Sequence, residues 1–190
     1  MKSCTETDAA VVDVRLFATL DRAILEQEFD RLLAANGPAL ARLAASYTNT
    51  PSDRDDLLQE IALALWQALP AFRGESSART FLFRIAHNRA IAYLARSQAR
   101  SRARFPAADV GDVHDPAPDP ESGLAREQTA ARLRQAIHRL PLVYRQAIVL
   151  ALEDMGFAEI AAVLGISESN VGARLTRARQ LLRESLEKRK

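Results

Sequence analysis

The chain has 190 residues, 48 % of them apolar, and a net charge of +2 at pH 7, which allows one or two small domains with modest cores. It contains no run of about 18 apolar residues and no basic flank leading into an apolar stretch, so we expect a cytoplasmic protein with neither membrane insertion nor a secretory signal. Its single cysteine, Cys4, cannot form an internal disulfide.

The composition predicts an all-α fold. Ala, Leu, Arg and Glu are abundant, glycine is scarce, and no window alternates apolar and polar residues as a half-buried strand would. Charge is segregated along the chain, because residues 72–105 and 124–190 carry net charges of +7 and +5, whereas residues 1–71 and 106–123 each carry −5. We therefore expect an N-terminal extension over residues 1–19, helical domains over 20–105 and 124–190, and a linker over 106–123. Whether the extension is disordered or regulatory stays open.

Two helical segments are expected in the first half of the first domain. One covers about residues 20–47 and is interrupted or bent around Asn36-Gly37-Pro38. The next starts near Ser52, which with Asp55 forms an acidic variant of the capping box. Its apolar stripe includes Leu57, Leu58 and Ile61. On periodicity alone, the acidic residues on its other faces indicate an ordinary solvated surface.

The segment from Phe72 to Arg100 combines arginines with aromatic residues. A Gly-Ser loop leads into a helix that we expect to be capped at Ser77 or Thr80. Cations and flat apolar rings together are what single-stranded nucleic acid requires, because its phosphates are charged and its bases are unstacked. Some of the rings must pack in the core, so Phe81, with its neighbours Leu82 and Ile85, is expected to face inward.

The segment from Phe105 to Gly123 contains four prolines, two glycines and five acidic residues and has no helical period. It is typical of an extended linker, and about 18 stretched residues reach about 60 Å. A passive tether and a functional acidic segment are equally compatible with this composition.

Residues 157–179 predict two short helices that meet at a sharp turn. Ala161 is small where the helices cross, Gly165 permits the turn, and Ile166 and Val171 fill the space between the helices. This is the pattern of a DNA-binding helix-turn-helix, with an ordinary helical hairpin as the alternative.

Three motifs in this order resemble the extracytoplasmic-function group of bacterial sigma factors over nearly the whole chain. The segment Asp53-Arg-Asp-Asp-Leu-Leu-Gln-Glu60 is similar to the family's polymerase-binding helix. The segments Phe72-Arg-Gly-Glu-Ser-Ser77 and Phe83-Arg-Ile-Ala-His-Asn88 resemble the part that opens and reads the −10 promoter element. Leu140-Pro141, Arg145 and the helix-turn-helix resemble the domain that reads the −35 element.

The resemblance implies a role for particular residues and for several partners. The partners are core RNA polymerase, promoter DNA in duplex and single-stranded form, and an anti-sigma protein. Ala92, Gly172 and Ala173 depart from what many relatives carry, so the promoter sequence does not follow from the resemblance. The implied residues are Asp56, Leu57, Leu58, Gln59 and Glu60 for core polymerase, Phe72, Arg84, Asn88, Arg89 and Arg96 for the −10 element, and Ser169, Asn170, Arg174 and Arg177 for the −35 element.

No enzymatic role is expected. The histidines His87, His114 and His138 are far apart and lack paired acids at metal-binding spacing, and no glycine-rich phosphate loop occurs, so we expect no cofactor and no metal. His87 is interpreted as a helix-surface or DNA-facing residue. The alternative function is a stand-alone helix-turn-helix transcriptional regulator, which would bind its operator without polymerase.

Overall fold

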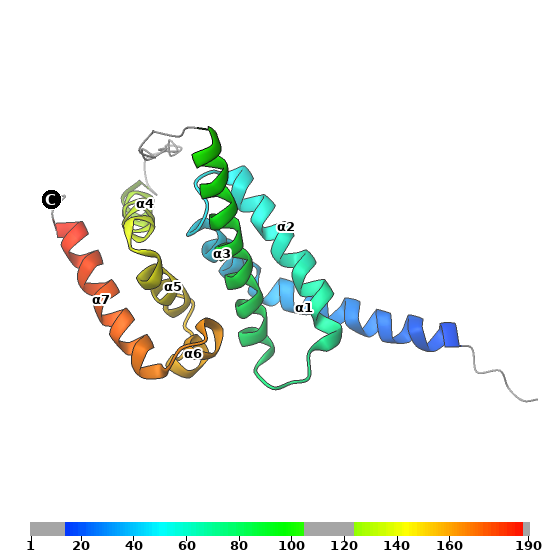
Figure 1. Cartoon of the computed structure of the whole chain (residues 1–190). Helices are drawn as coiled ribbons and strands as arrows, with labels where there is room; N and C mark the ends of the chain where they lie inside the picture. Colours follow the sequence, from blue (N-terminus) through cyan, green and yellow to red (C-terminus); the bar gives the residue numbers. More distant parts are fainter. Residues whose placement is uncertain (1–13, 105–123, 188–190) are drawn as a thin grey trace, which may run out of the picture.

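The computed structural model describes residues 14–104 and 124–187, and within these ranges every regular element is helical, as the composition predicts (Figure 1). The helices form two groups, an N-terminal bundle and a C-terminal bundle. None of the described helices combines the length and the apolar composition that a membrane span requires. The expected linker over 106–123 lies outside the described residues.

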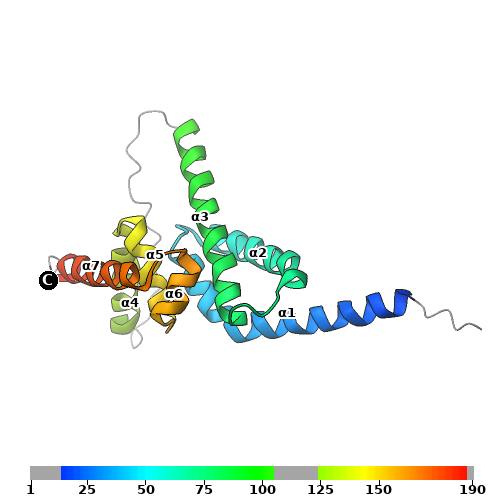
Figure 2. The same cartoon turned by 60° about the horizontal axis from the view of Figure 1, so that its bottom comes forward.

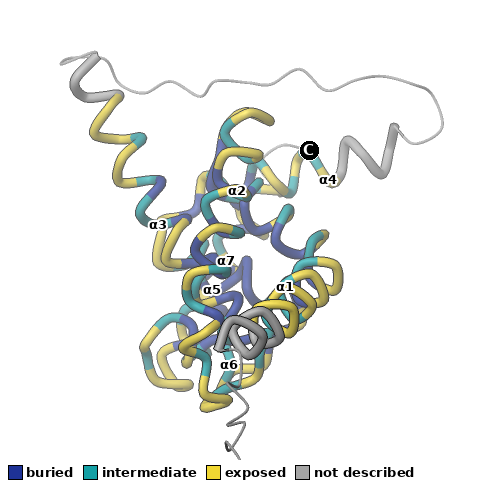
Figure 3. Tube along the Cα trace, turned by 90° about the vertical axis from the view of Figure 1, so that its right-hand side faces the viewer, coloured by how far each residue is buried: buried dark blue, intermediate teal, exposed yellow. Residues whose placement is uncertain are grey.

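The N-terminal bundle consists of α1 (Val14–Ala45), α2 (Pro51–Ala68), the short 3-10 helix η1 (Leu69–Ala71) and α3 (Ala78–Arg104). The three long helices pack against one another, while the N-terminal half of α1 projects from the bundle (Figure 2), and residues 22–31 of this helix are largely exposed (Figure 3). The core is apolar, and its largest fully buried side chains are Leu43, Leu57, Ile61, Leu65, Leu82 and Phe83.

Helix α1 begins at Val14 and runs through Pro38 without a break, so of the expected interruption or bend at Asn36-Gly37-Pro38 the interruption is wrong. A proline inside a helix removes one backbone hydrogen bond. Leu32, Leu40 and Leu43, on both sides of Pro38, are buried in the bundle core. Their burial compensates for the lost bond and keeps the helix continuous.

The helix caps were predicted with mixed success. Helix α2 is capped by Thr50, whose side chain accepts a hydrogen bond from the Asp53 N–H, with Pro51 in the first turn, so the Ser52 capping box is wrong. For α3 the expected cap is confirmed, because the Ser77 hydroxyl accepts from the Thr80 N–H at 3.0 Å.

The C-terminal bundle consists of α4 (Leu124–Arg139), α5 (Leu142–Ala151), α6 (Phe157–Leu164) and α7 (Glu168–Glu187). Helices α6 and α7 form the predicted helix-turn-helix. Gly165 ends α6 with a φ of 66°, a left-handed conformation that glycine adopts without strain, and Val171 is fully buried. Arg145 donates hydrogen bonds to the His138 and Leu140 carbonyls, which satisfies the end of α4.

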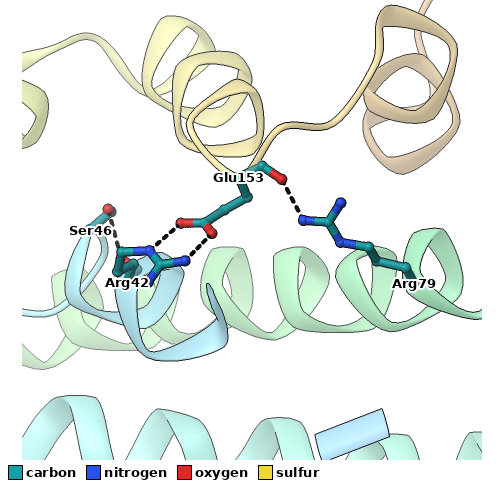
Figure 4. Close-up of polar contacts among 4 residues, drawn as sticks. All are labelled: Arg42, Ser46, Arg79 and Glu153. Atoms are coloured by element: carbon teal, nitrogen blue, oxygen red, sulfur yellow. Dashed lines mark hydrogen bonds and ion pairs between the residues drawn. The ribbon is translucent and has the colours of Figure 1, made fainter. Parts of the chain in front are cut away.

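The two bundles are in direct contact, which the sequence did not indicate. Helix α6 packs against α3, and polar contacts join α1 and α3 to the segment around Glu153 (Figures 1 and 4). The contact leaves the expected DNA-reading residue Asn88 exposed.

Candidate nucleic-acid and polymerase interfaces

A small open pocket lies where η1, the following loop and the start of α3 meet. Its volume is about 270 Å³, and its lining includes Phe72, Phe81 and Arg84. This volume is below the range of about 300–1,000 Å³ that is usual for drug-sized ligands, so the pocket suits a smaller group such as one planar ring. Gly74, in the loop that borders it, has a φ of 75°, which favours glycine at this turn.

The pocket contains aromatic rings beside a cation. The rings of Phe72 and Phe81 are 4.6 Å apart between centroids, and the Arg84 guanidinium lies 5.9 Å from the Phe81 ring centroid. Phe81 is half-buried, so it combines the expected core packing with a face in the pocket. Such a site provides a stacking surface and a positive charge to an unpaired base and its phosphate.

The expected −10 residues of α3 lie on its exposed surface. Arg84 and Asn88 are four residues apart and both exposed, so they share one face of the helix, and Arg89 is exposed next to them. Arg96 lies further along α3, where its Nη2 contacts the two carboxylate oxygens of Glu60 at 2.7 and 2.6 Å. The structure thus pairs a residue expected to bind DNA with one expected to bind polymerase.

The expected polymerase-binding residues divide between the surface and the core of α2. Asp56 and Gln59 are exposed, and Leu58 and Glu60 are partly exposed. Leu57 is fully buried, so we reassign it from a direct contact to the packing that supports the helix.

His87 corrects a further expectation, because it is buried and not on the helix surface. Its ring makes an edge contact with Tyr47, with centroids 6.5 Å apart. Burial lowers the pKa of His87 to about 4, because the charged imidazolium is poorly solvated inside the bundle. The residue is therefore a neutral core group near neutral pH.

The expected −35 residues follow the exposed side of α7. Ser167 begins this helix by accepting a hydrogen bond from the Asn170 N–H. Asn170 then accepts from Arg174 Nε at 2.9 Å, and Arg177 donates to Gln180 at 2.8 Å. Ser169, Asn170 and Arg177 are exposed, and Arg174 is partly exposed. These polar side chains point outward from a helix that starts just after the sharp turn.

Residues outside the expected sets also contribute to these surfaces. Arg73, Glu75 and Ser76 line the pocket, and the motif that begins at Phe72 was the signal that could have identified them. In the part of the chain that the structure describes, no three His, Cys, Asp or Glu residues are grouped as a metal site would require.

Two family models match the chain. The model of sigma-70 region 2 matches residues 32–100, and the model of sigma-70 region 4 matches residues 130–182. The first match lies in the N-terminal bundle with the pocket, and the second lies in the C-terminal bundle with the helix-turn-helix.

Curated relatives resemble the chain over most of its length. The RNA polymerase sigma factor CnrH of Cupriavidus metallidurans is 35 % identical over 164 residues, which cover 83 % of this chain and 85 % of CnrH. The extracytoplasmic-function sigma factor SigM of Mycobacterium tuberculosis is 32 % identical, covering 81 % of this chain and 74 % of SigM. The extracytoplasmic-function sigma-E factor of Escherichia coli is 30 % identical, over 83 % of this chain and 85 % of the E. coli factor.

Solved structures show the same fold. CnrH, in complex with the cytosolic domain of CnrY, superposes with a TM-score of 0.62 at 31 % identity, covering 85 % of this chain and 89 % of CnrH. The sigma factor RpoE of Bartonella quintana, in complex with the anti-sigma factor NepR, gives a TM-score of 0.68 at 24 % identity. The match covers 85 % of this chain and 98 % of RpoE. The second likeness supports the fold alone.

Proposed function

Because the chain belongs to the extracytoplasmic-function group of the sigma-70 family, we propose that it is an alternative sigma factor. In this role it binds core RNA polymerase in the cytoplasm, directs it to promoters through their −10 and −35 elements, and promotes strand separation. The observation that carries the proposal is the aromatic pocket beside Arg84 and the exposed Asn88, on a bundle matched by sigma-70 region 2.

In the N-terminal bundle, an unpaired base of the −10 element enters the pocket beside Phe72. Base–aromatic stacking stabilises a base by about 1–3 kcal/mol, which offsets part of the few kcal/mol that unstacking costs. Asn88 offers an amide that can both donate to and accept from a base edge. Arg84 and Arg89 lie close enough along α3 to hold neighbouring phosphates.

In the C-terminal bundle, α7 enters the major groove of the −35 element. Ser169 and Asn170 occupy its first turn, as the leading residues of a recognition helix do. Arg174 and Arg177 follow at spacings of four and three residues along the same side. An arginine can donate two hydrogen bonds to one guanine, and the remaining contacts hold phosphates.

The exposed side of α2 binds the polymerase. Asp56 and Gln59 provide a charge and an amide on the surface, with Leu58 and Glu60 partly exposed beside them. A carboxylate next to an apolar side chain fits a basic, partly apolar groove on a protein partner.

An anti-sigma protein is a further partner in this proposal. The solved relative CnrH is held in a complex with the cytosolic domain of CnrY. This complex supports a protein partner of that kind for this chain, and it does not identify it.

Co-elution with core polymerase tests the proposal against the stand-alone regulator. The purified protein should co-elute with core enzyme on gel filtration and should bind a promoter fragment tightly only in that complex. The exchange of Asp56 and Gln59 for alanine should weaken co-elution, whereas exchange of the exposed Gln180, on the other bundle, should not. Tight, sequence-specific DNA binding without polymerase, combined with no co-elution, would favour the regulator.

A further inference from the structure

An ion pair joins the two bundles across 111 residues of sequence (Figure 4). Arg42 of α1 donates from Nε and Nη2 to the two carboxylate oxygens of Glu153 at 2.8 and 2.6 Å. The Glu153 side chain is 4 % exposed, whereas that of Arg42 is 62 % exposed. A two-pronged contact of this kind is among the stronger polar interactions in proteins, because both hydrogen bonds are assisted by charge.

Three further hydrogen bonds surround this pair. Arg79 of α3 donates to the main-chain carbonyl of Glu153, so the segment between α5 and α6 is attached to two helices of the N-terminal bundle. Thr80 donates to Glu159 at 3.3 Å, and His138 Nε2 donates to the Ala45 carbonyl at 2.8 Å. We call these hydrogen bonds, together with the Arg42–Glu153 pair, the interdomain contact.

The interdomain contact keeps the two DNA-reading surfaces close together. Helix α6 packs against both α3 and α7. Packed helices lie about 8–10 Å apart, so two such steps separate α3 from the adjoining part of α7 by about 20 Å. The −10 and −35 elements are about 25 base pairs apart by their names, which is about 80 Å of duplex at about 34–36 Å per turn. The closed arrangement therefore cannot engage both elements at once.

We propose that the Arg42–Glu153 ion pair holds the free protein in this closed arrangement and that the interdomain contact must open before the protein can serve polymerase at a two-element promoter. This inference rests on the proposed function for its effect on promoters. The closure of the free protein does not depend on that function.

The polar character of the contact makes it reversible. When the bundles separate, the buried Glu153 carboxylate regains water, which compensates for much of the lost attraction. Inside the closed protein, by contrast, removal of Arg42 leaves a buried carboxylate without its principal partner, which favours opening. Because only open molecules can reach both elements, the apparent affinity of the polymerase-bound protein for a two-element promoter is the intrinsic affinity reduced by the open fraction.

Energy transfer between dyes on the two bundles measures the closure directly. In a Cys4→Ser background, dyes would be attached to cysteines at the exposed positions Gln67 of α2 and Arg183 of α7. Arg42→Ala and Glu153→Gln should each lower the transfer efficiency of the free protein. Arg31→Ala is the matched control, because it removes an α1 arginine whose partner Glu28 lies on the same helix.

In complex with core polymerase, the same variants should bind a two-element promoter more tightly. We expect a gain of up to about tenfold for Arg42→Ala and no gain for Arg31→Ala, since tenfold corresponds to about 1.4 kcal/mol and one charge-assisted pair is of that order. Arg42 is exposed, so its removal leaves both apolar cores intact, and circular dichroism would verify this. Unchanged transfer efficiency and unchanged affinity in a folded Arg42→Ala variant would overturn the proposal.

A cross-link tests whether opening is required. Arg42→Cys and Asp154→Cys place thiols on the two sides of the contact, and a short bismaleimide would join them in the Cys4→Ser background. The joined protein should lose at least about tenfold of its transcription from a two-element promoter, relative to the same variant with both thiols capped separately. Full activity of the joined protein would overturn the proposal. Failure of the wild-type protein to bind polymerase would instead refute the proposed function and leave the energy-transfer result intact.

Discussion

The two proposed DNA-binding surfaces differ in how many parts of the chain build them. The −10 surface combines η1, a loop with a left-handed glycine and the start of α3, which together form a pocket with an aromatic wall. The −35 surface is one side of the single helix α7. The first therefore depends on the packing of a whole bundle, and the second depends on local sequence placed on a rigid helix.

The largest effect should come from removing core packing in the bundle that carries the pocket. Phe83 is fully buried in the N-terminal bundle. Phe83→Ala should lower the free energy of unfolding by about 3–5 kcal/mol, because it removes a buried ring and leaves a cavity. Chemical denaturation followed by circular dichroism measures this loss. A loss below about 1 kcal/mol would contradict the view that the pocket depends on this core.

The stability of the N-terminal bundle should depend on pH through the buried His87. The pKa of His87 is lowered to about 4 by burial, so the unfolded chain takes up a proton near pH 6.5 and the folded chain does not. The contribution of the neutral His87 to the free energy of unfolding, up to about 3 kcal/mol, is fully present above pH 6.5 and is lost as the pH falls towards 4. Denaturation at several pH values should show that the free energy of unfolding depends less steeply on pH between 6.5 and 5 in His87→Gln than in the wild-type protein. An identical slope in this variant would contradict a neutral, buried His87.

The pocket itself should matter for melted DNA more than for stability. Phe72→Ala should weaken holoenzyme binding to DNA with an unpaired −10 strand by about 1–3 kcal/mol, through lost stacking. Asn88→Ala should lower open-complex formation more than duplex binding, because its amide acts on an unpaired base. Fork-junction and duplex probes compared by fluorescence anisotropy measure both variants. Equal losses on the two probes would contradict base capture.

The single-helix surface should respond differently. Arg174→Ala should weaken −35 recognition by about 1–3 kcal/mol and relax the preference at one position if its guanidinium contacts a base. Binding to promoters altered at each −35 position measures this, with the salt dependence recorded in parallel. Unchanged affinity together with unchanged preference at every position would remove Arg174 from the interface.

The smallest effect concerns the pair that links the polymerase and DNA surfaces. Glu60 holds Arg96 in an exposed ion pair. Glu60→Gln should free Arg96 and raise polymerase-independent DNA binding by less than about fivefold, since exposed pairs contribute little. The matched control is Glu26→Gln, which breaks the exposed pair between Arg22 and Glu26 within α1. A decrease in DNA binding would contradict this account.

Local features of the fold could be predicted from the sequence, because their causes are local. Gly165 and Val171 mark the helix-turn-helix, and Ser77 caps α3 as expected. Thr50 displaced Ser52 as the cap of α2, since Pro51 suits the first turn and leaves the residue before it as the cap.

Contacts between distant segments could not be predicted. Nothing near Arg42 or Glu153 in the sequence indicates that these residues meet, because the pair depends on how the two bundles approach each other. The burial of His87 likewise follows from its contact with Tyr47 of another segment. Asn88, one position further along α3, is exposed as the proposed role requires. The residue-level roles at both DNA surfaces stay predictions.

In vitro transcription tests the central claim most directly. Core polymerase with the purified protein would be supplied with fragmented genomic DNA, the RNA 5′ ends would be mapped, and unpaired thymines would be detected with permanganate. The account predicts transcripts that start at discrete sites, with melting over the −10 element that is reduced by Asn88→Ala. Transcription no more specific than that of core enzyme alone, with no permanganate-reactive region, would contradict it.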